Sequence, residues 1–143
     1  GDEALEPGDV VAVVGIAASP FDDLGMLLQV RKASPGSPLV GVTSGRAEEY
    51  ISQETGAHSL VTRAAQPAAA GDFVSVVIYG PVWVKSGDGV AVGQRVTLGE
   101  AGRVRGVRNV AVGGLTVAEA APSLGLALSA PSDGHVWVLV NPQ

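Results

Sequence analysis

The chain has 143 residues, of which 46% are hydrophobic and only 16% are charged. This length suits a single hydrophobic core, and the composition is too apolar for a disordered segment. The net charge is −5 and the basic residues are scattered, so we expect neither a broad basic face nor a nucleic-acid partner. The chain has no cysteine, which excludes disulfides, thiolate metal sites and thiol catalysis.

Short valine-rich runs separated by turn residues dominate the chain. The 20 glycines and 9 prolines fall between these runs, which is typical of many short strands joined by turns. We therefore predict an all-β fold, a compact barrel or sandwich of about 8–11 short strands with at most one or two short helical turns. The predicted strands are Val10–Ile16, Leu27–Lys32, Leu39–Thr43, Ser59–Arg63, Phe73–Tyr79, Val82–Lys85, Arg95–Leu98, Val104–Val112, Leu124–Ser129 and His135–Asn141.

Helix is expected at two places only. Thr116-Val117-Ala118-Glu119 fits a capping box, and Pro122 would end such a helix after one or two turns. Ala47–Gln53 is predicted to be a second short helix or, equally well, a loop.

The domain organisation follows from one low-complexity segment. Residues 64–70, an Ala/Pro-rich stretch, are predicted to connect two β-rich halves at about 8–63 and 71–141. We expect residues 1–143 to form one β-domain. The acidic start, without an initiator methionine or a signal peptide, favours a processed product or an excised domain. No apolar run approaches the roughly 20 residues that span a bilayer, so no membrane partner is expected.

The first and last strands are apolar on both faces. A lone small β-domain rarely needs such strands, so each either lies between layers of the fold or is covered by another chain. The predicted interface residues are Val10, Val11, Val136, Trp137, Val138 and Leu139.

The chain carries few candidates for catalysis or metal binding. His58 and His135 are the only histidines, and without cysteine or a paired histidine they predict no metal site and no cofactor. Asp22 and Asp23 lack the acidic ladder of a calcium loop and are interpreted as a solvated turn.

Ser44 and Lys85 are the one candidate catalytic pair in the sequence. A desolvated lysine with a lowered pKa can activate a serine nucleophile. Against this, Lys85 precedes a turn that should leave its ammonium group in water, and Ser44-Gly45 should form a turn closing Leu39–Thr43, away from His58. We therefore predict that the protein is not an enzyme and keep Ser44 and Lys85 as the alternative.

A third possibility is a carbohydrate-binding or small-ligand-binding β-domain. Its candidate residues are Tyr50, Tyr79, Trp83 and Asp88. Trp83 and Trp137 lie in valine-rich strands, where tryptophan more often fills a core or an interface.

The order of motifs along nearly the whole chain resembles a known module. The motifs are Gly8-Asp9-Val10-Val11, Val40-Gly41-Val42-Thr43-Ser44-Gly45, Gly80-Pro81-Val82-Trp83-Val84-Lys85, Val92-Gly93-Gln94-Arg95-Val96, Leu124-Gly125-Leu126-Ala127-Leu128 and Val136-Trp137-Val138-Leu139-Val140-Asn141. In this order they resemble the C-terminal β-rich module of phage tail-fibre, capsid-decoration-like and bacterial surface proteins.

The resemblance implies a trimeric or otherwise oligomeric virion component without a cofactor, acting as a fibre-end, cap or decoration domain. Its expected partners are further copies of itself and another phage-like particle or a cell-surface protein. Some related modules release themselves from the fibre, and Ser44 matches their suspected nucleophile. The expected location is a virion-like particle or the outside of a cell, with the cytoplasm as the alternative.

Overall fold

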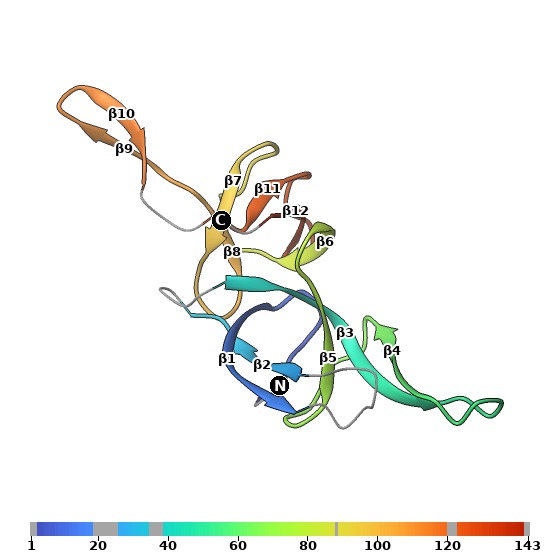
Figure 1. The fold of residues 1–143 in the computed structure, drawn as a ribbon. Coiled ribbons are helices and arrows are strands. Elements are labelled where there is room, and N and C mark those ends of the chain that lie inside the picture. Colours follow the sequence, from blue (N-terminus) through green and yellow to red (C-terminus); the bar gives the residue numbers. More distant parts are fainter. Residues whose placement is uncertain (1–2, 19–25, 35–38, 88, 120–122, 142–143) are drawn as a thin grey trace.

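The computed structural model describes residues 3–18, 26–34, 39–87, 89–119 and 123–141 (Figure 1). Within these ranges there are twelve strands and no helix, which confirms the all-β prediction. The strands form two five-stranded sheets and a separate two-stranded hairpin. All the strand pairs are antiparallel and neither sheet closes into a barrel, so the arrangement is sandwich-like.

The first sheet is built around one long strand. Its strands are β1 (Val10–Ala18), β2 (Met26–Lys32), β3 (Leu39–Ile51), β4 (His58–Ala64) and β5 (Phe73–Val77). The order is β2-β1-β3-β4, and β5 also pairs with β3. Because β3 has 13 residues, it pairs with β1 near its start and with β4 along its second half.

The last strand of the chain is an interior strand of the second sheet, next to the edge strand β6 (Gly80–Lys85). The sheet has the order β6, β12 (His135–Val140), β11 (Gly125–Ala127), β7 (Arg95–Leu98) and β8 (Val104–Gly106). Val136, Val138 and Val140 are completely buried, while Trp137 and Leu139 occupy the opposite face of β12. One face of β12 is therefore buried by this chain, whereas Trp137 on the other face is 46% exposed. The alternative expectation, that another chain covers this second face, stays a prediction.

The two sheets share one hydrophobic core. A single cluster joins Val10 and Val42 of the first sheet to Val84, Val96 and Val138 of the second. A smaller cluster lies within the first sheet, around Leu5, Val11 and Val30. β5 follows the predicted connector at 64–70 yet pairs with β3, so the chain passes from one sheet to the other between Val77 and Gly80.

Three local expectations are wrong. Most of Ala47–Gln53 belongs to β3, not to a helix or loop, and the predicted strand Val104–Val112 is divided between β8 and β9 (Asn109–Val112). Ser44 and Gly45 lie inside β3 beside a bulge, not in a turn.

The predicted capping box also fails, because Thr116–Ala118 belongs to β10 (Leu115–Ala118). Gly113 and Gly114 have φ of 57° and 85°, which allows a tight turn that folds β10 back onto β9. Pro122, the predicted helix stop, lies outside the described residues.

Candidate functional site

The predicted catalytic lysine is held in an ion-pair cluster. Lys85 Nζ lies 3.0 Å from Asp9 Oδ1 and 3.1 Å from Glu6 Oε2. The Lys85 side chain is only 14% exposed and that of Asp9 is fully buried. The expectation that the Lys85 ammonium group lies in water is therefore wrong.

This environment raises the pKa of Lys85 above its usual value. Burial by itself would lower the pKa, but the neighbouring carboxylates of Asp9 and Glu6 together outweigh it. The same contact lowers the pKa of Glu6, through its hydrogen bond with Lys85. A general base needs the opposite shift, so Lys85 stays protonated at neutral pH.

Ser44, the predicted partner of Lys85, does not form a catalytic group with Lys85 or with His58 in the described part of the chain. Ser44 lies on β3, where its carbonyl accepts the Ala65 N–H at 3.2 Å, and its hydroxyl makes no hydrogen bond with Lys85. The backbone of His58 pairs with Ile51 at the end of the β3–β4 hairpin. Ile51 lies seven positions after Ser44, which is about 23 Å along β3.

The Gly8-Asp9 turn joins the two sheets. Asp9 Oδ2 accepts the Glu6 N–H at 2.8 Å and lies 4.0 Å from Lys32 Nζ. Around it, the Gly8 N–H donates to the Thr43 carbonyl of β3 at 2.8 Å, and the Gly8 carbonyl accepts the Lys85 N–H of β6 at 3.0 Å. The buried carboxylate and the ammonium group therefore link segments far apart in the sequence.

An aromatic cluster covers the outer face of β6 and β12. The Trp83 ring is stacked on His135, with ring centroids 5.4 Å apart and planes 5° apart. Trp137 lies opposite Trp83 in the strand register, and its ring is tilted by 52° at the same centroid distance. Trp137 is 46% exposed, so this cluster presents an aromatic surface to solvent.

The residues proposed from the sequence for sugar binding are dispersed. Tyr50 lies near the end of β3, Tyr79 lies between β5 and β6, and Trp83 belongs to the aromatic cluster. Asp88 lies outside the described residues, as do Asp22 and Asp23. His135 and Trp137 were missed as neighbours of Trp83 because their contact depends on the pairing of β6 with β12.

The predicted interface residues divide into two groups. Val10, Val11, Val136 and Val138 are 0% exposed and are covered by this chain itself. Trp137 is exposed and Leu139 is half-buried on the outer face of β12. Of the predicted set, only these two offer surface to another chain.

The β9–β10 hairpin has a bare aliphatic face. It extends away from both sheets (Figure 1, orange). Leu115 pairs with Val112 across the hairpin, and Val117 follows on the same face. These side chains are 59% (Val112), 70% (Leu115) and 45% (Val117) exposed. The opposite face carries the small or polar residues Ala111 and Thr116.

An ion pair fixes the base of this hairpin. The Arg105 guanidinium donates to both carboxylate oxygens of Glu119, and Glu119 Oε1 also accepts the Arg108 N–H at 2.8 Å. The hydrogen bond from Arg105, followed by that from Arg108, lowers the pKa of Glu119 to about 2. The sequence pattern assigned Glu119 to a helix start, so this role was missed.

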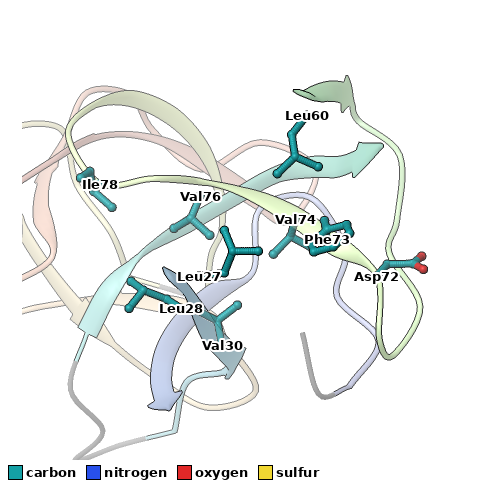
Figure 2. Close-up of a pocket in the computed structure, with 9 residues that line it drawn as sticks. All are labelled: Leu27, Leu28, Val30, Leu60, Asp72, Phe73, Val74, Val76 and Ile78. Carbon is teal, nitrogen blue, oxygen red and sulfur yellow. The ribbon is translucent and has the colours of Figure 1, made fainter. Parts of the chain in front are cut away.

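An apolar groove opens between β2 and β5. Figure 2 shows side chains of the two strands pointing toward one another, with Leu60 of β4 nearby. The groove has a volume of about 270 Å³ and is lined by Leu27, Leu28, Val30, Leu60, Asp72, Phe73, Val74, Val76 and Ile78. Leu28 and Ile78 are 56% and 62% exposed. No sequence pattern indicated that these strands approach each other.

Comparison with protein-family models, curated proteins and solved structures finds no match to this chain. Within the described residues, no three histidine, aspartate or glutamate side chains gather to hold a metal ion. The same part of the chain contains no helix long and apolar enough to cross a membrane.

Proposed function

We propose that the protein is a non-enzymatic assembly module that forms a homo-oligomer, with a trimer as the expected state. In this role it serves as a fibre-end, cap or decoration domain. The bare aliphatic face of the β9–β10 hairpin is the observation that carries the proposal.

Among the residues that the structure describes, the β9–β10 hairpin has no hydrophobic core of its own. An isolated two-stranded hairpin is at best marginally stable in water, and a third strand or a packed face is normally required. Full burial of a valine or leucine side chain contributes about 1.5–3 kcal/mol. In the single chain these side chains stay largely exposed and do not make this contribution; they are Val112, Leu115 and Val117. A partner surface that buried them would therefore stabilise the hairpin.

The order of motifs supports the same role, since the resembled tail-fibre and decoration modules are oligomeric. Other copies of this chain are the first expected partners, followed by a phage-like particle or a cell-surface protein. The raised pKa of Lys85 gives no support to the alternative in which Ser44 cleaves its own precursor.

Sedimentation equilibrium over a dilution series tests the proposal. We expect a mass of three times the 14.3 kDa of one chain at micromolar concentration. A mass of one chain over the whole series would contradict the proposal.

The aromatic cluster supports a second candidate function, the binding of a carbohydrate or another small ligand. The exposed Trp137 ring, backed by the Trp83–His135 stack, offers a flat apolar face with polar edges. Titration of oligosaccharides against tryptophan fluorescence tests it, with Trp137→Ala as the variant. Equal titration curves for the wild type and this variant would refute the candidate.

A further inference from the structure

We infer that the β9–β10 hairpin of one copy inserts its aliphatic face into the β2–β5 groove of the next copy. The inference rests on the proposed assembly function and assigns a partner to each surface. Both surfaces are unusually apolar for exposed positions: Leu115 of the hairpin is 70% exposed, and Ile78 at the groove is 62% exposed.

The positions of the two surfaces require two molecules. In Figure 1 the hairpin projects from one end of the molecule, whereas β2 and β5 lie at the other end. A hairpin rooted beside β8 through the Arg105–Glu119 ion pair cannot fold back to the groove of its own chain. The contact is therefore head-to-tail between copies, and such contacts close into rings or continue as filaments. A ring of three copies satisfies the expected trimer.

The two surfaces match in chemistry. No charged residue occurs from Asn109 to Ala118, so insertion of the hairpin buries no ion. All but one of the groove-lining side chains are apolar. The exception, Asp72, has its Oδ2 engaged by the Ala69 N–H at 2.9 Å. Contact between the two surfaces therefore leaves no charged group that must find a new hydrogen-bond partner.

The two surfaces also match in length and in strand edges. Each hairpin strand has four residues, about 13 Å, while the six residues from Phe73 to Ile78 extend about 20 Å along the groove. Within the described strands, β2 pairs with β1 and β5 pairs with β3, each along one edge. An inserted hairpin can therefore add backbone pairing at the groove to its side-chain packing.

Disulfide cross-linking tests the inference directly, because the chain has no cysteine of its own. Two differently tagged variants, Leu115→Cys and Ile78→Cys, are mixed, allowed to exchange subunits and oxidised. A bound hairpin holds its thiol near the groove at a millimolar effective concentration. The yield of mixed disulfide should therefore be about tenfold higher for this pair than for the control pairs.

Two control variants test whether cross-linking depends on the hairpin face and on the position in the groove. Thr116→Cys places the thiol on the opposite hairpin face, and Val92→Cys places it at a 66% exposed site outside the groove lining. A second test pair, Val117→Cys with Leu28→Cys, covers the case in which one variant fails to fold, judged by circular dichroism.

The possible results distinguish a wrong hairpin–groove contact from a wrong assembly function. A dominant Leu115→Cys homodisulfide would show hairpin-to-hairpin contact and overturn the inference. Oligomers in which neither test pair exceeds its controls would also overturn it, while leaving the proposed assembly function standing. Monomers at every concentration would remove both.

Discussion

Replacing Lys85 by methionine tests the ion pair that links the two sheets. The substitution keeps an unbranched side chain but leaves the fully buried Asp9 carboxylate without its partner at 3.0 Å. Removing one member of a buried pair costs about 3–5 kcal/mol, because the remaining charge is uncompensated. The Glu6 N–H at 2.8 Å and Lys32 at 4.0 Å still contact Asp9. We therefore expect the lower end of that range, about 3 kcal/mol.

Urea unfolding at pH 7 and constant protein concentration measures this loss. The double variant Asp9→Asn with Lys85→Met should recover part of it, because no buried charge then remains. Glu6→Gln is the control: the Glu6 side chain is 69% exposed, and its removal should cost less than about 1 kcal/mol. A free energy of unfolding for Lys85→Met within about 0.5 kcal/mol of the wild-type value would show that the buried ion pair does not stabilise the fold.

The pH dependence of the same pair has a definite sign. Because the pKa of Lys85 is raised in the folded state, its contribution to stability is complete below the usual pKa of 10.5. This contribution is lost as the pH rises from 10.5 through the higher folded-state pKa. The difference in unfolding free energy between the wild type and Lys85→Met should therefore shrink in that range.

Three further predictions concern other contacts. Gly102→Ala should cost more than about 1 kcal/mol in urea unfolding, because Gly102 has φ of 70° and the new Cβ would lie 2.6 Å from Lys32 Cγ; an unchanged midpoint would contradict this. Glu119→Gln should speed amide hydrogen exchange in the β9–β10 hairpin at neutral pH. The wild type should show the same loosening as the pH falls from 4.5 towards about 2, where Glu119 becomes protonated, and a flat profile would contradict this. Trp137→Ala should cost about 2 kcal/mol, roughly half the value for a buried tryptophan, since Trp137 is 46% exposed; urea unfolding measures it, and a loss of 4 kcal/mol or more would show that Trp137 is buried in solution.

The all-β fold was predictable because it depends on local patterns. A valine-rich run bounded by turn residues predicted the strand His135–Asn141, and the observed strand β12 ends one residue earlier, at Val140. Its two apolar faces predicted that it lies between layers of the fold or is covered by another chain. In the structure β12 lies between β6 and β11 and buries only its valine face, while Trp137 is 46% exposed. Such features need no knowledge of which strands meet.

The errors arose where a local pattern competes with strand pairing. Thr116–Glu119 satisfies the rule for a helix start, but the two-glycine turn before it allows β10 to pair with β9. Gly45 was interpreted as a turn residue, whereas in β3 it follows a bulge that tolerates glycine inside a strand.

The candidate sites depend on long-range contacts and could not be predicted. Lys85 contacts Glu6, which is 79 positions away in the sequence. The turn after Lys85 predicted an ammonium group in water, whereas this contact places it in an ion pair. The groove needs β2 to lie near β5, and the aromatic cluster needs β6 paired with β12. No pattern within one segment contains this information.

Sedimentation velocity of two matched hairpin variants tests whether the aliphatic face of the β9–β10 hairpin holds the oligomer together. Leu115→Lys places a charge on the aliphatic face, whereas Thr116→Lys adds the same charge to the opposite face of the same strand. We expect an oligomeric wild type, a dissociation constant raised at least about thirtyfold by Leu115→Lys, and a change below about threefold for Thr116→Lys. Equal effects of the two substitutions, or an oligomer that Leu115→Lys leaves intact, would contradict this expectation.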